Sequence, residues 1–517
     1  MREALGVQIT CIFTASDESN LNAMSLRPKR ELSAPSSRLD LVLRVGVENA
    51  HRPISKPEPT SDPLSDLPPD LFQLVQLALA ASGGEGCRAI DALCQVNRAL
   101  RAYCMQWGFW KDLCGLRGFP EPPNPKVLAS DAERLAYWRK RFHAYCTGTA
   151  VNNVTIRAAV GLLLDNGGTV PDDHPNGPIE GWYTEDVTDM TKLFNPNRDI
   201  VSMLERIPLY KFNHPLPWDT SNVTTLDGTF SRCSAFDQPL NWDTSRVTNM
   251  HGTFDGARRF NHPLPWDTSR VTDMSQTFHD ADYFNQPLHW DTSRVTTMSG
   301  MFGRVERFNQ PLPWDTRNVT TMFAMFDKAK RFNQRLDWDT RSVTTMAYMF
   351  FGCEAFNQPV AFDTRNVVSM EDLFWGCKEF NSPVTLDTRN VTNMHNMFSL
   401  CRKLAQPVVL SDTSNVTTME RMFFECRRFN HPLAFDTSRV TNMEEMLSGA
   451  DDFDQPVDHW DTSRVTKMDY MFMYTALSNR DALPKWYWSA VKARRAKNNY
   501  HYPYYDQEHV VHIGSVD

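Results

Sequence analysis

An aspartate followed by threonine recurs along this 517-residue chain at a nearly constant interval. The step is 24 residues seven times, then 25, 24 and 25. Aligned carboxylates could hold a row of calcium ions, but calcium-binding solenoids present several oxygens per turn and this unit offers one. The spacing therefore favours aspartates that accept hydrogen bonds from backbone N–H groups just downstream and fix a turn. The aspartates are Asp219, Asp243, Asp267, Asp291, Asp315, Asp339, Asp363, Asp387, Asp412, Asp436 and Asp461.

Repeated arginines are the second set that could do chemistry. Five lie three residues after the repeat aspartate: Arg246, Arg270, Arg294, Arg439 and Arg464. Copies with Asn or Ser at that place often have the arginine one residue earlier: Arg317, Arg341, Arg365 and Arg389. A row of guanidinium groups beside a strand could bind a partner. In the alternative interpretation each arginine pairs with the aspartate of its own or the next copy, so the row has little net electrostatic field.

Cysteine, methionine and asparagine also recur at equivalent positions of successive repeats, which we call columns. These columns have simpler interpretations. Cys233, Cys353, Cys377, Cys401 and Cys426 share a position that other copies fill with Ala, which predicts a tight buried slot; stacked disulfides are the second interpretation. Methionine at regular spacing predicts core filler in place of a soft-metal site. The Asn that follows a repeated Phe is expected to be a buried turn residue whose amide satisfies neighbouring backbone groups.

No sequence signature of catalysis accompanies these columns. The chain has no G-x-x-x-x-G-K, G-x-S-x-G or H-E-x-x-H string, and its 14 histidines are scattered. We therefore expect a non-enzymatic protein without cofactor or catalytic metal.

The apolar residues of the repeat predict the elements that position these groups. Val, Met, Phe and Phe recur four, seven, eleven and seventeen residues after the aspartate. Such columns form a continuous core from units that cannot fold alone. V-T-x-M suits a short strand, and the x-M-F piece that follows suits one helical turn. The expected fold is an α/β solenoid of leucine-rich-repeat type over 181–476, with one strand and one helical turn per coil.

The rest of the chain divides by composition. Residues 1–63 are rich in Ser, Pro, Arg and Glu and are expected to be a disordered tail. Residues 64–148 show helical spacing, most clearly over 131–146, and predict a small all-α domain. A helical cap and linker is expected over 149–180, and a C-terminal cap and tail over 477–517.

Bulk properties exclude some classes. With 62 acidic and 54 basic residues the chain lacks the positive excess of a dedicated nucleic-acid binder. No run approaches the ~20 apolar residues that cross a bilayer. Eleven cysteines without a C-x-x-C pair favour a reducing compartment. The first sixteen residues are similar to a poor secretory signal, because Gln8 and Thr10 interrupt the apolar stretch.

The repeat unit W-D-T-S-x-V-T-x-M resembles that of the BspA-like surface-protein family, relatives of the leucine-rich repeats, over about 180–475. That resemblance implies a ladder-like binding solenoid with no enzymatic role. Several members are exported adhesins, which keeps a secreted protein as the alternative.

The helical domain resembles an F-box from its LPPDL opening to Trp110. The resemblance implies that certain residues would contact a Skp-type adaptor: Leu67, Pro68, Leu71, Leu93, Cys94, Val96, Leu100 and Trp110. An F-box-like head on such repeats looks like an arrangement found in large DNA viruses of amoebae.

Head and solenoid together predict an adaptor. The head would recruit a Skp/cullin ubiquitin ligase, and the solenoid, through Arg246 and its four equivalents, would bind an unknown target protein. We expect a cytoplasmic or nuclear protein of a eukaryotic, virus-infected cell, monomeric outside its complex, with no nucleic-acid partner and no membrane insertion. The alternative is an exported surface or adhesion protein.

Overall fold

The structure is a computed structural model that describes residues 67, 69–79, 90, 93–94, 104–105, 107–116, 130–147, 149–165, 176, 178–195, 212–479 and 483–489. The expected tail over 1–63 lies outside these residues. The chain forms two compact units, which are described separately: the first comprises Met1–Leu162, Val170–Thr188 and Trp218–Asn222, and the second comprises Leu163–Thr169, Asp189–Pro217 and Val223–Asp517.

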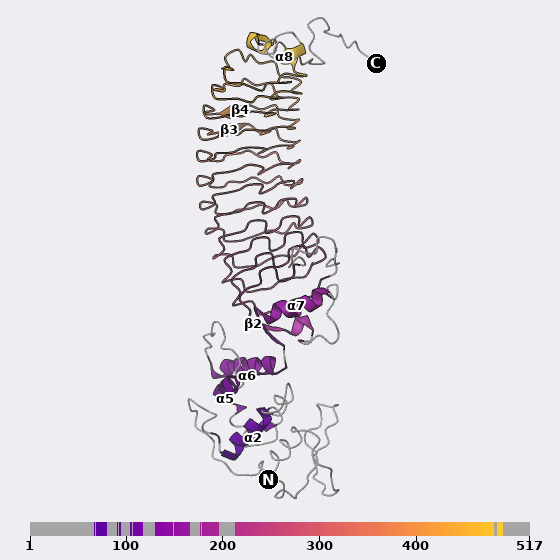
Figure 1. Cartoon of the computed structure of the whole chain (residues 1–517), viewed down its shortest axis with the longest axis vertical. Helices are drawn as coiled ribbons and strands as arrows, with labels where there is room; N and C mark the ends of the chain where they lie inside the picture. Colours follow the sequence, from indigo (N-terminus) through magenta and orange to yellow (C-terminus); the bar gives the residue numbers. More distant parts are fainter. Residues whose placement is uncertain are drawn as a thin grey trace, which may run out of the picture. The chain divides into compact units, whose positions relative to one another are not determined.

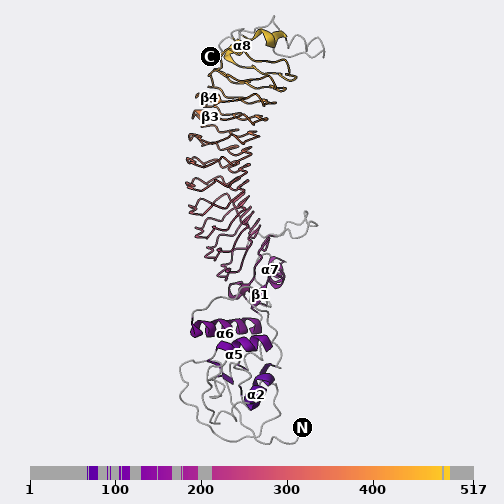
Figure 2. The same cartoon turned by 90° about the vertical axis from the view of Figure 1, so that its left-hand side faces the viewer.

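The first unit contains the helices α2 (Pro69–Leu79), α5 (Trp107–Leu116), α6 (Asp131–Thr147) and most of α7 (Thr155–Asp165). Figures 1 and 2 both show α5 and α6 side by side. The helix expected over 131–146 is present as α6. It begins with a capping box, because Ser130 N donates to Glu133 Oε2 at 3.1 Å and Glu133 N donates to Ser130 Oγ at 3.2 Å.

A buried ion pair connects α6 to a small parallel sheet in the same unit. The sheet pairs β1 (Ala150–Asn152) with β2 (Tyr183–Asp186), which follows the 3₁₀ helix η2 (Ile179–Gly181). Arg141 of α6 is fully buried, and its Nη1 donates to Asp186 Oδ1 at 2.8 Å. The Tyr145 hydroxyl donates to the other oxygen of Asp186. Buried charges require such partners, so this contact holds the helix against the strand.

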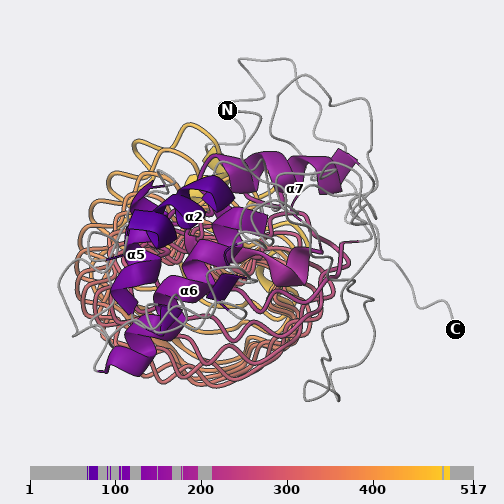
Figure 3. The ribbon, with the colours of Figure 1, turned by 90° about the horizontal axis from the view of Figure 1, so that it is seen from below.

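The second unit is the predicted repeat solenoid. Figure 1 shows its coils stacked one after another, and Figure 3 shows them superposed along the long axis, so equivalent positions form rows. Each coil joins the next through a parallel bridge at the x of V-T-x-M, for example Thr297 with Thr321. Within 212–479, longer strands occur at β3 (Val384–Leu386) and β4 (Val408–Leu410), which also pair in parallel.

The expected helical turn in each coil is wrong. Residues 212–475 contain no helix, and the first one beyond them is α8 (Ala476–Asn479). The ninth and thirteenth residues after the repeat aspartate have positive φ, as Tyr348 (62°) and Gly352 (67°) do. A left-handed residue ends a helix, so each coil instead makes consecutive tight turns. Alternate backbone N–H groups then bond to the next coil, as Gly300 N does to the Phe323 carbonyl at 2.8 Å.

The core is the set of apolar columns that the sequence predicts. In the middle coils every Val, Met and Phe that belongs to one of these columns is buried, and equivalent aromatic rings stack on one another. The ring centroids of Phe278 and Phe302 lie 5.7 Å apart with an interplanar angle of 7°. Those of Trp266 and Trp290 lie 6.3 Å apart with an interplanar angle of 1°. Each Trp of these coils donates Nε1 to a Leu carbonyl of the preceding coil, as Trp290 does to Leu264 at 3.2 Å. Neighbouring coils therefore complete one another's core.

Among the described helices, none has the length and apolarity needed to cross a membrane.

Candidate binding surface

The repeat aspartates fix turns, which confirms the prediction. Asp291 Oδ1 accepts a hydrogen bond from Ser293 N at 2.9 Å, and the same contact recurs in every coil from Asp219 to Asp461. Hydrogen bonds from the Ser293 side chain and backbone lower the pKa of Asp291. The carboxylates are therefore part of the structural frame of the solenoid.

Sequence reasoning missed the role of the threonine that follows each aspartate. The Thr292 hydroxyl donates to the Asp315 carbonyl one coil later at 2.9 Å, and this side chain is 1% exposed. Thr316 and Thr340 make the same contact with Asp339 and Asp363. The invariance of D-T within this one chain was the available signal.

The asparagine column makes a ladder between coils. Asn285 Oδ1 accepts from Asn309 N at 2.9 Å, and Asn309 Oδ1 accepts from Asn333 N at 2.9 Å. The predicted bonding to neighbouring backbone is confirmed, but these residues are half-buried or exposed, so the expected burial is wrong. The reason is that each side-chain amide makes its hydrogen bonds along the edge of the stack, which water also reaches.

The cysteine column forms small core slots, as expected. Cys233, Cys353, Cys377, Cys401 and Cys426 are buried free thiols, which overturns the alternative of stacked disulfides. The Cys353 thiol donates to the Phe326 carbonyl of the preceding coil at 3.0 Å. Burial raises the pKa of the Cys353 thiol, so the thiolate is suppressed.

The arginines divide into two groups. Arg317, Arg341, Arg365 and Arg389 pair with the aspartate of their own coil, as Arg317 Nε does with Asp315 at 2.9 Å, which confirms the pairing interpretation for them. Among the predicted site residues, Arg439 donates to Asn415 Oδ1 at 2.7 Å. Arg270, Arg294, Arg439 and Arg464 are exposed and Arg246 is half-buried. Their role in binding a partner stays a prediction.

A second surface, which the sequence did not single out, lies on the outer side of the turns. We call it the turn face: the residues eight, nine, twelve and thirteen positions after each repeat aspartate. The residues between them, such as Met349 and Phe350, point into the core. Unlike the core columns, these positions change from coil to coil, because packing inside the coil does not constrain their side chains.

Four aromatic residues of the turn face form a continuous run across three coils. The ring centroids of Phe323 and Tyr348 lie 5.5 Å apart, those of Tyr348 and Phe351 5.7 Å, and those of Phe351 and Trp375 4.3 Å. Phe323 is 45% exposed, and the other three are half-buried. This is aromatic surface that the core does not need.

Carboxylates surround and continue this run. In the six coils from Asp339 onward the turn face holds seven carboxylates and one guanidinium, that of Arg421, whereas the five coils before it hold four carboxylates and three cations. The Tyr348 hydroxyl donates to Glu371 Oε1 at 3.0 Å. Burial raises the pKa of Asp372. The seven are Glu371, Asp372, Glu420, Glu425, Glu444, Glu445 and Asp469.

One cluster on the turn face has the donor set of a metal site. Ligand atoms of Asp255, His279 and Asp280 lie within 4.8 Å of one another. His279 Nδ1 lies 2.9 Å from Asp255 Oδ1, and this hydrogen bond raises the pKa of His279. The contact is a hydrogen bond between neighbouring coils, and protonation of His279 would compete with coordination of a metal ion.

Five of the eight adaptor-contact residues that the F-box resemblance implies lie in the interior of the first unit. Leu67, Leu71, Leu93, Cys94 and Trp110 are buried in one cluster, at 8% exposure or less. The remaining three, Pro68, Val96 and Leu100, lie outside the described residues. Contact with an adaptor through the five buried side chains would require this core to open, and that role stays a prediction.

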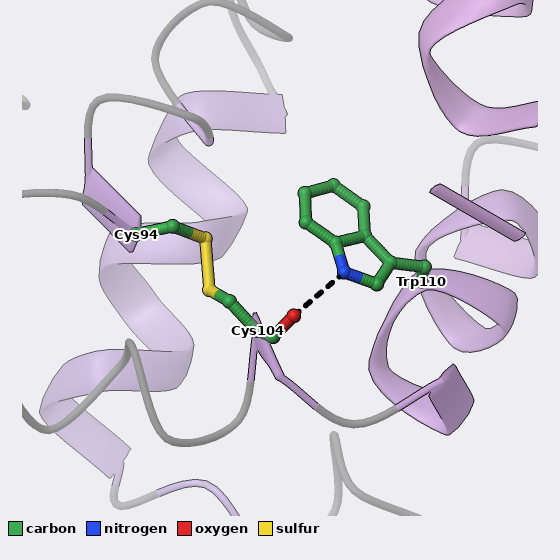
Figure 4. The surroundings of a disulfide bond; sticks show 3 residues. All are labelled: Cys94, Cys104 and Trp110. Atoms are coloured by element: carbon green, nitrogen blue, oxygen red, sulfur yellow. Dashed lines mark hydrogen bonds between the residues drawn. A yellow bond between two sulfur atoms is a disulfide. The ribbon is translucent and has the colours of Figure 1, made fainter. Parts of the chain in front are cut away.

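A disulfide joins Cys94 to Cys104 in the same cluster. Figure 4 shows the bond beside Trp110, whose Nε1 donates to the Cys104 carbonyl at 2.9 Å. The expectation of a reducing compartment rested on the low cysteine content and the absence of C-x-x-C pairs, but this bond links cysteines ten residues apart. The sulfur of Cys94 is used inside the protein and is not available as a contact atom.

Fold and surface together define a tandem-repeat solenoid with a constant interior and a varied turn face. The family described as "Mycoplasma protein of unknown function, DUF285" matches in overlapping stretches that together run from 172 to 501. The chain belongs to this family, which agrees with the resemblance to BspA-like repeats.

The chain was also compared with solved structures and with curated proteins. A leucine-rich repeat protein from Eubacterium ventriosum is among the similar solved structures, with 14% identity, 53% of this chain and 80% of that chain covered, and a TM-score of 0.25. No curated protein matches.

Proposed function

We propose that this protein is a non-enzymatic scaffold whose solenoid binds a protein partner through the turn face. One observation carries the proposal: an unbroken run of partly exposed aromatic residues, from Phe323 to Trp375, in positions that the core leaves free. Exposed aromatic side chains are enriched at protein interfaces, where they supply most of the binding energy.

Photo-crosslinking in the native cell tests this proposal. Benzoylphenylalanine replaces Phe323 in the full chain, and in a second variant it replaces Thr296, which is exposed in the strand column of the coil before. We expect a protein adduct from position 323 and none, or far less, from position 296. Absence of a protein adduct at position 323, or equal yields at both, would contradict the proposal.

The first unit supports two roles for the scaffold. In the first, an F-box-like head recruits a Skp/cullin ubiquitin ligase in the cytoplasm or nucleus, and the solenoid presents the target. What supports it is the resemblance of the LPPDL segment to an F-box and a helical stretch that precedes the repeats in the sequence. Because Leu67 and Leu71 are buried, the adaptor would have to bind other residues of the head.

In the second role the chain is exported and acts at a cell surface. The Cys94–Cys104 disulfide favours this role, since such bonds persist in oxidising compartments. Differential alkylation and mass spectrometry of the protein from its native cell separate the two. An oxidised pair supports export, and a reduced pair together with copurification of a Skp-type protein supports the adaptor.

A further inference from the structure

We propose that the turn face from Phe323 to Asp469 binds a cationic, Lys/Arg-rich segment of a partner protein in extended conformation. This inference rests on the proposed function and names the chemistry of its partner. We call the surface the acidic–aromatic patch; it consists of the four aromatic residues and the seven carboxylates described above.

Charge is the first argument. From the Asp339 coil onward the turn face holds seven carboxylates against the single guanidinium of Arg421, and the coil of Phe323 adds one charge of each sign, Asp327 and Lys328. Arg421 itself is already paired, since its Nε donates to Glu445 Oε2 at 2.8 Å. Glu425 is likewise paired, with Arg427 at 2.9 Å, and Asp372 is buried. The half-buried Glu371, Glu420 and Glu444 still give these coils an acidic excess that attracts a cation, whereas the coils before Asp339 carry nearly balanced charge.

The aromatic rings give the second argument. A cation over the face of an aromatic ring is attracted by the quadrupole of the ring. The chain's own cations already lie over turn-face rings. Lys328 Nζ is 5.4 Å from the centre of the Phe351 ring of the patch, and the Arg421 guanidinium is 5.8 Å from that of Phe424, two coils beyond Trp375. A ring beside a carboxylate, as the Tyr348 ring is beside Glu371, thus matches Lys and Arg better than an apolar or acidic partner.

The length of the patch sets the length of the segment. Six steps between neighbouring coils separate Phe323 from Asp469. With roughly 4.8 Å between paired strands, these steps span about 29 Å, which is the reach of about nine extended residues at ~3.3 Å each. A segment of that length lying along the stack meets every coil of the patch.

The experiment measures binding of a fluorescein-labelled nine-residue Lys/Arg-rich peptide to the full chain. Two variants use residues that the solenoid already has in the same columns: Trp375→Ser, as at Ser399, and Glu444→Ser, as at Ser275. The control is Asp227→Ser, the same column as Glu444 but outside the patch. We expect Trp375→Ser and Glu444→Ser each to weaken binding about fivefold and Asp227→Ser to change it less than about twofold.

Salt and competitors complete the test. Raising NaCl from about 0.05 to 0.5 M should weaken binding strongly, because the screening length shortens. A peptide with every Lys and Arg replaced by Gln should not bind. Equal binding of that peptide, equal binding to all variants, or preferential binding of a neutral oligosaccharide to the patch would overturn the inference.

The inference and the proposed function fail separately. If position 323 crosslinks to a protein that the cationic peptide does not displace, the scaffold proposal stands and this inference falls. If the peptide binds the patch but no protein crosslinks in the cell, the proposed function falls.

Discussion

The Thr292 hydroxyl donates to the Asp315 carbonyl of the following coil at 2.9 Å, in a place that water does not reach. The same two residue types thus fix the turn, through the aspartate side chain, and join adjacent coils, through the threonine. The D-T pair is the unit that determines both the shape of a coil and its stacking.

Replacement of Thr292 by Val should therefore destabilise the protein. The shapes are similar, but the Asp315 carbonyl loses its donor, and a buried unsatisfied group costs about 1–3 kcal/mol. Urea unfolding of the two proteins measures the difference. Thr296→Val is the matched control, since Thr296 is exposed and Val368 already stands in that column; its effect should stay within about 0.5 kcal/mol. Equal losses in both variants would refute this role for Thr292.

Acid should weaken the solenoid through the repeat aspartates. Hydrogen bonds lower the pKa of Asp315, Asp339 and Asp363 from the ordinary 3.8. Their stabilising effect is complete above that value and is lost as pH falls through the lower folded-state pKa. Melting temperature should thus fall below about pH 4.

A triple variant with Asn at these three positions should show a shallower decrease, because Asn keeps the turn but does not titrate. Asp337→Asn, which lies outside the column, is the control and should keep the wild-type slope. An unchanged slope in the triple variant would speak against the aspartates as the source.

The contribution of the His279–Asp255 pair to stability should depend on pH in the opposite direction. The hydrogen bond that His279 Nδ1 donates to Asp255 raises the pKa of His279 above 6.5. The stabilising contribution of the pair is therefore complete below that value and is lost as pH rises through the folded-state pKa. His279→Gln should lower the melting temperature at pH 5.5 and have little effect at pH 9. His289→Gln, at an exposed site of the same coil, should have little effect at either pH. A pH-independent loss in His279→Gln would instead indicate packing.

In the helical unit, Asp186→Asn should lower the free energy of unfolding by about 3–5 kcal/mol, because it leaves the buried Arg141 guanidinium without its counter-charge. Asp131→Asn removes the exposed partner of Arg134 and should cost less than about 0.5 kcal/mol. Thermal unfolding followed by circular dichroism at helix wavelengths distinguishes them. Similar melting temperatures for the two variants would mean that the Arg141–Asp186 pair is replaceable.

Periodicity in the sequence predicts the core of this protein well, because the columns that meet inside a solenoid must carry similar side chains in every coil. Val, Met, Phe and Cys lie where their spacing places them, and Asp291 fixes the turn that its neighbours indicate. The helical turn was predicted wrongly. The backbone at Tyr348 is left-handed, and its N–H bonds to the Glu371 carbonyl of the next coil, a partner that local propensity does not reveal.

The sequence by itself determined the number, length and interior of the coils, because one repeated string sets all three. Only the tertiary structure decided which varied positions meet. Phe323, Tyr348, Phe351 and Trp375 are spread over 53 residues and become one surface only when three coils stack. Likewise, Cys94 and Trp110 resemble contact residues in the sequence, but packing places them inside the helical unit. Stacking and burial are properties of the whole chain, and no local pattern specifies them.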